Sequence, residues 1–256
     1  MAILDLRGNE SLLGRPHYGV RVNDTNICYA YIRKNACSAF KVLFMRHLKA
    51  PRENGQSALR LMDINCRIKK IDAMKFDWRV CVLRDPLERA ASIYSNKFIQ
   101  KSGNADIFDN FYKLTNKSPE EASFEFFVKE YLSCNQEGID PHCYTQISHL
   151  LPITYNCAMM MENIHNDMMT IIGKNESDIV FRDRKNATSH KNNYADPCSA
   201  INAEKLSERY EADGRLPSYA ALYTDDLKDI ILNLYAPDLN LIKCIKEQND
   251  SEKYRR

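Results

Sequence analysis

Ile27-Cys28-Tyr29-Ala30-Tyr31-Ile32 is an apolar run that leads into the turn Arg33-Lys34-Asn35-Ala36-Cys37-Ser38 and then into a helical pattern. A second apolar run, Val80-Cys81-Val82-Leu83, leads in the same way into Arg84-Asp85-Pro86 and another helix. Buried strands that alternate with helices are typical of a parallel sheet covered on both faces. The sequence therefore predicts an α/β fold whose central sheet is mainly parallel and flanked by helices.

The two turns have the features of phosphate-binding sites. Each lies between a buried strand and a helix N-terminus, where free N–H groups and the helix dipole attract anions. With Lys34 at one turn and Arg84 at the other, the pair suits a nucleotide that carries 5′ and 3′ phosphates. Because one nucleotide must touch both turns, we expect the two strands to be adjacent, or nearly so, with both turns at the carboxyl edge of the sheet.

Periodicity along the rest of the chain predicts further helices and a strand. They are a helix opened by a capping box at Ser118–Glu121, a strand over 153–161, a helix over 162–172 closed by Gly173, and a helix capped by Thr224 and ended before Pro237. The segment 181–196 has no clear period and indicates a long loop. We expect a single domain over residues 1–247 and a charged, frayed tail over residues 248–256.

Composition excludes several classes of protein. The 256 residues are 44% hydrophobic and carry a net charge of +2, which gives no support to a broad nucleic-acid-binding surface. The nine cysteines are scattered without a CxxC pair, which favours a reducing cytoplasm over a disulfide framework. No run approaches the roughly 20 apolar residues of a membrane span. The first residues, Met1 to Gly8, are too few and too interrupted by charge for a signal peptide, so we expect none. We expect a cytoplasmic protein, with an excised Golgi-lumenal domain as the alternative.

The first turn differs from the standard nucleotide-binding loop. A Walker loop needs Gly-x-x-x-x-Gly-Lys-Ser/Thr, whereas this chain has no glycine between Gly19 and Gly55. A mononucleotide kinase or a GTPase is therefore disfavoured. What remains is a shorter loop in which N–H groups from about Ala36 to Phe40 wrap one anionic group, Lys34 adds a mobile charge, and Ser38 lies at or near the helix N-cap.

Two motifs carry a resemblance to a known family. The stretch from Lys34 to Lys41 is similar to the 5′-phosphosulfate loop of the carbohydrate sulfotransferases, although Arg33 stands where many relatives have proline. The stretch from Val82 to Phe98 resembles the 3′-phosphate motif of that family, because Arg-Asp-Pro is followed in order by an arginine, a serine, an aromatic residue and Lys-Phe. Weaker landmarks are Asp140-Pro141-His142, Met161–Ile164 and the helical stretch from Tyr223 to Leu241.

The resemblance implies a sulfotransferase that uses 3′-phosphoadenosine 5′-phosphosulfate and releases adenosine 3′,5′-bisphosphate. The acceptor would be a hydroxyl group or an amine of a glycan, a glycolipid or another small precursor, and no metal would be required. Because the sequence shows no membrane anchor, we expect a soluble, bacterial-type member of the family. Lys34 would offset charge on the leaving phosphate, while Arg84 and Ser92 would hold the 3′-phosphate. The 5′-phosphate loop would consist of Arg33, Lys34, Asn35, Ala36, Cys37, Ser38 and Ala39.

Acceptor activation needs a base near neutral pH, for which histidine is suited. His142 is the first choice, because the resemblance also places a functional histidine there; His149 and His190 are the other histidine candidates, and Glu53 is a carboxylate alternative. His142 is nearly as compatible with a structural role in its loop, as a donor to a carbonyl.

Less specific interpretations stay open for the remaining site residues and for the protein class. Ser92 is also compatible with a solvent-facing helix position, and Lys34 and Arg84 with ordinary surface charges. A kinase-like phosphotransferase would share the fold but should show Walker or magnesium-binding carboxylates, which we cannot place in the sequence. A non-catalytic nucleotide- or glycan-binding relative would lose Lys34, Arg84 or the base, and candidates for all three are present. We therefore favour the enzyme.

Overall fold

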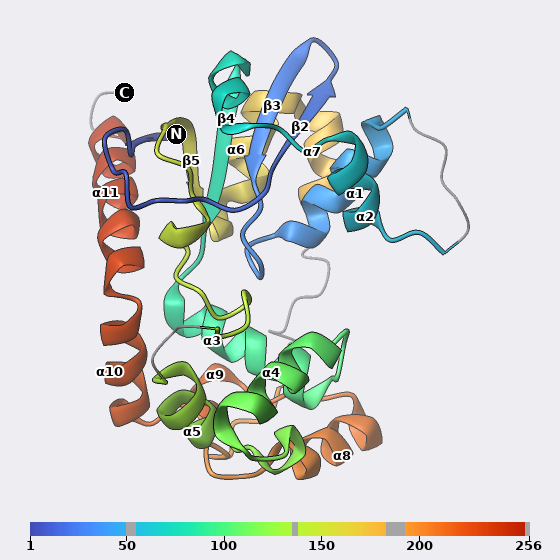
Figure 1. Cartoon of the computed structure of the whole chain (residues 1–256), viewed down its shortest axis with the longest axis vertical. Helices are drawn as coiled ribbons and strands as arrows, with labels where there is room; N and C mark the ends of the chain where they lie inside the picture. Colours follow the sequence, from blue (N-terminus) through green and yellow to red (C-terminus); the bar gives the residue numbers. More distant parts are fainter. Residues whose placement is uncertain (50–54, 135–137, 183–192, 254–256) are drawn as a thin grey trace. The chain divides into compact units, whose positions relative to one another are not determined.

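The computed structural model describes residues 1–49, 55–134, 138–182 and 193–253 (Figure 1). The chain forms two compact units, which we describe separately. The sheet unit comprises Met1–Arg84, Thr145–Asn186 and Asn240–Arg256, and the helical unit comprises Asp85–Tyr144 and Ala187–Leu239. The single domain expected over residues 1–247 stays a prediction.

The sheet unit contains a five-stranded sheet of order β1-β5-β4-β3-β2 (Figure 1). The central strands β3, β4 and β5 are parallel, whereas β1 and β2 pair antiparallel at the two edges. The predicted α/β fold is confirmed, and the strands of the two quoted runs are neighbours with Ile27 opposite Trp78. The strands are β1 (Ala2–Asp5), β2 (His17–Val22), β3 (Thr25–Ala30), β4 (Trp78–Leu83) and β5 (Thr154–Met160).

Helices cover both faces of this sheet, so the central strands are buried on both sides. On one face, Phe40, Leu43 and Phe44 of α1 belong to the same buried cluster as alternate residues of β3 and β4. On the other face, Ile242 and Ile245 of α11 belong to a cluster with the intervening strand residues. The helices of this unit are α1 (Cys37–His47), α2 (Ala58–Asn65), α6 (Ile164–Ile172), α7 (Lys174–Phe181) and most of α11 (Ala236–Lys253), with 3-10 turns at Lys70–Lys75, Ile147–His149 and Met161–Asn163.

Helix α11 continues through the segment that the sequence predicted to be frayed. It extends past Gln248 to Lys253. The side-chain amide of Gln248 accepts a hydrogen bond from Ile3 N–H at 2.8 Å and donates one to Ile3 C=O at 2.9 Å. Ile245, one turn earlier, is fully buried. The charged composition of this end did not indicate that these contacts with strand β1 hold the helix in place.

The helical unit has an aromatic core. Tyr94, Phe98, Phe111, Phe124 and Phe127 are all fully buried and contact one another. The helices of this unit are α3 (Pro86–Tyr94), α4 (Ala105–Thr115), α5 (Phe124–Phe126), α8 (Ala203–Asp213), α9 (Tyr219–Leu222) and α10 (Asp225–Leu234), with π-helical continuations at Ser95–Ile99 and Phe127–Leu132 and a 3-10 turn at Pro119–Glu121.

The predicted capping box at Ser118–Glu121 is wrong, because the cap lies at Ser123. The Ser118 hydroxyl donates to the Glu120 carboxylate at 2.6 Å, and the chain makes only a 3-10 turn there. The Ser123 hydroxyl accepts from Phe126 N–H at 3.1 Å and opens the helix. In contrast, the predicted caps at Thr224 and Gly173 are confirmed: Thr224 accepts from Leu227 N–H, and Gly173 follows α6 with a φ of 83°.

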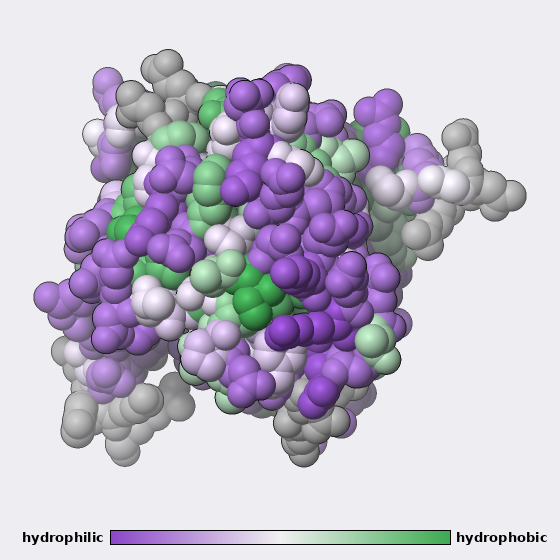
Figure 2. Space-filling model, turned by 90° about the horizontal axis from the view of Figure 1, so that it is seen from below, coloured by the Kyte–Doolittle hydropathy of each residue, from purple (hydrophilic) through white to green (hydrophobic). Residues whose placement is uncertain are grey.

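The face drawn in Figure 2 is mostly hydrophilic, with scattered hydrophobic areas among its coloured residues. Across the described ranges, no helix combines the length and the apolar character that a bilayer crossing requires.

His17 on β2 makes the stability of the protein depend on pH. The ring is 1% exposed; its Nδ1–H donates to Arg15 C=O and its Nε2 accepts from the Tyr155 hydroxyl, both at 2.7 Å. Burial lowers the pKa of His17 from 6.5 to about 4. The unfolded chain therefore binds this proton more readily than the folded protein. We expect the free energy of unfolding to fall by about 3 kcal/mol as pH drops from 6.5 towards 4.

Urea unfolding of the parent and of His17→Gln at pH 7 and pH 4.5 measures this contribution, because other titrating groups affect both proteins alike. We expect a smaller loss of stability in the variant. An equal loss in both proteins would show that His17 does not contribute.

Candidate functional site

The loop between β3 and α1 adopts a backbone conformation that is unusual for its residues. Lys34 has a φ of 69° and Ala36 a φ of 57°, both in the left-handed region that normally favours glycine. Each such residue costs about 1–3 kcal/mol and persists only where the surrounding structure holds it. Residues in this region cluster at ligand-binding sites, so the loop is a candidate anion site although it lacks the glycines of a Walker loop.

The N-terminus of α1 is not capped by a side chain. Its N-cap residue is Ala36, which makes no side-chain capping hydrogen bond, and the first turn contains no acidic residue. Ser38 is thus the second residue of the helix, two positions after the N-cap residue. The amides of Ala39 and Phe40 already donate to Ala36 C=O, so the candidate anion donors of this loop precede Ala39. The positive end of the helix dipole lies at these residues.

Arg84 and Lys34, the two basic residues predicted at the turns, contact each other. Arg84 follows β4, is only 7% exposed, and donates from Nη1 to Lys34 C=O at 3.4 Å. The contact follows from the topology, because the carboxyl ends of the parallel neighbours β3 and β4 meet at one edge of the sheet. Lys34 itself is half-buried. Neither residue is an ordinary exposed surface charge.

The buried side-chain amides of Asn35 and Gln146 connect the Lys34 turn with the Arg84 turn. Asn35 Nδ2 donates to Val82 C=O at 2.8 Å and to Gln146 Oε1. Gln146 Oε1 also accepts from Arg84 N–H, and Gln146 Nε2 donates to Arg84 C=O, both at 2.9 Å. Asn35 is one of the loop residues predicted from the sequence, whereas Gln146 was not predicted. The only available signal was a lone glutamine shortly after the Asp140-Pro141-His142 landmark, which does not indicate these contacts.

Asp85 and Pro86 of the Arg-Asp-Pro motif begin the helical unit, and Ser92 follows them on the same helix. The Asp85 carboxylate caps α3 by accepting from Leu87 N–H at 2.9 Å and Glu88 N–H at 3.1 Å, and Pro86 occupies the first helical position. Ser92 lies further along α3 and is 3% exposed. The alternative of a solvent-facing serine is therefore wrong, and the role of Ser92 in phosphate binding stays a prediction.

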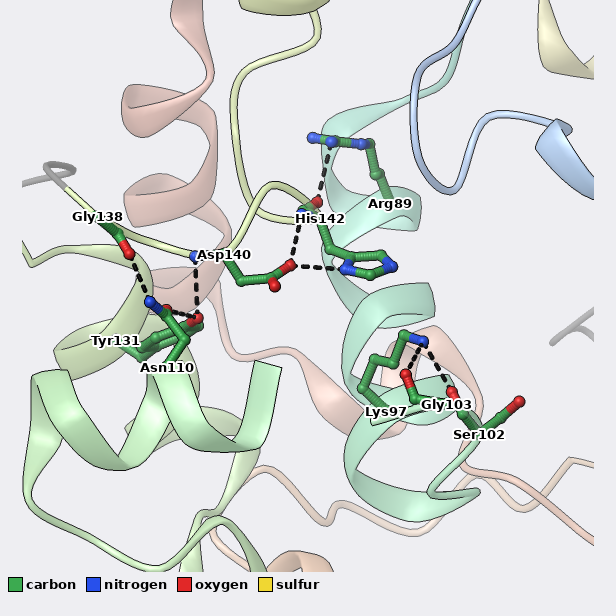
Figure 3. A network of polar contacts seen from close by, with 9 residues as sticks. All are labelled: Arg89, Lys97, Ser102, Gly103, Asn110, Tyr131, Gly138, Asp140 and His142. Atoms are coloured by element: carbon green, nitrogen blue, oxygen red, sulfur yellow. Dashed lines mark hydrogen bonds and ion pairs between the residues drawn. The ribbon is translucent and has the colours of Figure 1, made fainter. Parts of the chain in front are cut away.

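His142 lies in a loop that fixes its ring (Figure 3). The Asp140 carboxylate accepts from His142 Nδ1–H at 2.6 Å and from His142 N–H at 2.7 Å. This bond assigns the proton to Nδ1 and leaves the lone pair on Nε2, the form required of a general base. The Nδ1–H of the ring thus donates to a carboxylate, and the role of His142 as general base stays a prediction. The side chain retains 14% exposure.

Arg89 and Tyr235 hold the main chain of this loop. Arg89 is 1% exposed and donates to His142 C=O at 3.0 Å (Figure 3). It also donates to Tyr144 C=O at 2.7 Å. The Tyr235 hydroxyl donates to Cys143 C=O at 2.7 Å. Three successive carbonyls of the loop are therefore bound by buried donors of α3 and the C-terminal end of α10.

The other candidate bases differ from His142. His149 is 1% exposed and its Nδ1–H donates to Thr145 C=O at 3.0 Å, an arrangement typical of a structural histidine. His190 and Glu53 lie outside the described residues. Within the described ranges, no three His, Cys, Asp or Glu side chains come together in a way that could hold a metal ion.

Comparison with known proteins identifies one family. A family model described as Sulfotransferase family matches residues 18–242. No curated protein and no solved structure matches the chain. The matched range includes both strand–turn–helix motifs and the His142 loop.

Proposed function

Because the chain belongs to the sulfotransferase family, we propose that it transfers the sulfuryl group of 3′-phosphoadenosine 5′-phosphosulfate to a hydroxyl group or an amine of a glycan or glycolipid. The observation that carries this proposal is the contact of the Arg84 guanidinium with Lys34 C=O. It brings two basic turns, each suited to a phosphate, to one edge of the sheet. A donor with phosphate groups on both the 5′ and 3′ positions fits such a pair.

The donor supplies the sulfuryl group, whose bond to the 5′-phosphate oxygen breaks as a bond to the acceptor oxygen forms. Lys34 offsets the negative charge that develops on the leaving phosphate. The α1 N-terminus and the loop residues that precede Ala39 bind the 5′-phosphate, while Arg84 and Ser92 bind the 3′-phosphate. His142 Nε2 takes the proton of the acceptor hydroxyl, and Asp140 stabilises the imidazolium that results. The protein thus contributes positioning and charge stabilisation.

The cysteines bear on the cellular compartment that we propose for the reaction. All nine cysteines are free thiols, and most of them are buried. Free thiols support a reducing compartment, so we place the reaction in the cytoplasm. The glycan class of acceptor rests on the similarity of the two motifs to those of the carbohydrate sulfotransferases.

Nucleotide binding tests the assignment of Arg84. We expect adenosine 3′,5′-bisphosphate to bind far more tightly than AMP, because the 3′-phosphate has its own charged ligand. Arg84→Ala should reduce that preference by about ten- to a hundredfold, the typical effect of a charged hydrogen bond. Isothermal titration calorimetry with both nucleotides measures it.

Arg21→Ala is a matched control, because Arg21 is an exposed arginine of the same sheet that pairs with Asp24. We expect the preference of this variant to equal that of the parent. Equal affinity of the parent for the two nucleotides would contradict the proposed function.

A further inference from the structure

We propose that Gln146 is a positioning residue that fixes Arg84 relative to the Lys34 turn and thereby sets the preference of the site for a nucleotide with phosphate at both ends. The inference rests on the proposed function, and it assigns a role to a residue that contacts neither phosphate in that proposal. It is carried by the buried amide contacts at the carboxyl ends of β3 and β4.

Gln146 binds the main chain of Arg84 as a neighbouring strand would. Its Oε1 accepts from Arg84 N–H and its Nε2 donates to Arg84 C=O, both at 2.9 Å. Gln146 is fully buried. Arg84 lies one residue beyond the end of β4, where the sheet no longer fixes the main chain. The reciprocal pair of bonds therefore holds the base of the Arg84 side chain in one place.

Asn35 connects the same glutamine to the other turn. Its Nδ2 donates to Gln146 Oε1 and to Val82 C=O, so both of its N–H bonds are used in fixing the loop to the end of β4. Asn35 is fully buried, and its Oδ1 has no hydrogen-bond partner among the described residues. An unpaired buried acceptor is costly, which indicates that the two acceptors facing Nδ2 impose the orientation of this amide.

The single oxygen Gln146 Oε1 thus accepts from both turns, from Asn35 of the first and from Arg84 of the second. Asn35 stands between Lys34 and Ala36, the two left-handed residues of the loop. Loss of Gln146 leaves Arg84 N–H, Arg84 C=O and one Asn35 N–H without this partner. The spacing of the turns then relaxes, and a ligand that must bind both of them loses more affinity than a ligand that binds one.

The variant Gln146→Leu tests this spacing role with little change in side-chain volume. We expect the ratio of affinities for adenosine 3′,5′-bisphosphate and AMP to fall at least tenfold, as measured by calorimetry. Asn156→Leu is the matched control. Like Gln146, Asn156 bridges main-chain groups of β4, but it does so at the N-terminal end of that strand. It accepts from Arg79 N–H at 2.7 Å and donates to Asp77 C=O at 2.8 Å.

We expect Asn156→Leu to lower the melting temperature without changing the affinity ratio. A folded Gln146→Leu protein that keeps the parental ratio would overturn the inference and leave the proposed function standing. If the parent itself shows no preference for the bisphosphate, the proposed function fails, and the inference fails with it.

The variant Gln146→Glu keeps the test decisive if the leucine variant does not fold. A protonated glutamic acid reproduces the glutamine contacts, with one oxygen as acceptor and its O–H as donor to Arg84 C=O. The ionised form has no such donor, and burial raises the pKa of a carboxyl group. At each pH, the affinity ratio of the variant is compared with that of the parent. We expect the ratio of the variant to be lower than that of the parent at high pH and to approach the parental ratio as the pH falls. A ratio equal to that of the parent at every pH would overturn the inference.

Discussion

We expect Lys34→Ala to lower kcat by about a hundred- to a thousandfold and also to weaken the binding of the proposed sulfuryl donor. This range is typical of the loss of one preorganised charge stabiliser at a reacting centre. Binding weakens as well, because the ammonium group already interacts with the donor in the ground state. Residue 34 has a left-handed backbone conformation. Lysine and alanine bear that strain alike, because neither is glycine, so the substitution leaves the backbone strain of the loop unchanged.

Turnover assays with labelled donor, together with titrations of adenosine 3′,5′-bisphosphate, measure the two effects separately. Lys49→Ala serves as the control, because Lys49 is an exposed lysine just beyond the opposite end of α1. Full activity of the Lys34→Ala protein would remove Lys34 from the reaction.

We expect His142→Ala to lower kcat by about a hundredfold and to leave nucleotide affinity nearly unchanged. The reason is that a general base acts only on the acceptor, so its loss affects the transition state and not the binding of the donor. Asp140→Asn should give a smaller loss of kcat, because the ring then loses the carboxylate that assigns its tautomer and stabilises its charged form.

Turnover assays and nucleotide titrations of the same variants measure the effects on kcat and on nucleotide affinity separately. His47→Ala is the control, since His47 contacts the carboxylate of Glu176 at 2.9 Å at the far end of α1. Parental activity in the His142→Ala protein would transfer the role of base to a carboxylate. The phosphate-binding assignments rest on other residues and would be unaffected.

The sequence predicted those parts of the fold in which a local pattern is decisive. The central strands were predictable because each is an apolar run buried on both faces, and the turns because strand ends lead directly into helices. The edge strand β2 was missed, since its residues His17–Val22 are interrupted by Gly19 and its alternation is short. The cap at Ser123 was also missed, because Ser118 offered a complete capping pattern whose hydroxyl instead binds Glu120.

The candidate site was predictable in residue type and less so in geometry. Lys34 and Arg84 followed from turn chemistry and parallel topology, and the structure brings them into contact. The role of Gln146 depends on long-range contacts with Asn35 and Arg84, which leave no local pattern in the sequence. The tautomer of His142 likewise depends on the loop conformation that brings Asp140 to its ring.

The left-handed residues Lys34 and Ala36 have a consequence for the thermodynamics of binding. Glycine residues have many backbone conformations available, so ordering a glycine-rich loop costs much conformational entropy. Residues that carry side chains have fewer conformations available in the unfolded chain, so ordering a loop built from them costs less. Here the side chain of Asn35, between the two, is bound to the end of β4. The ordering entropy of the loop is thus lost when the protein folds and not when an anion arrives. Any ligand of this loop meets a preorganised surface, and its affinity is not reduced by a cost of ordering the backbone.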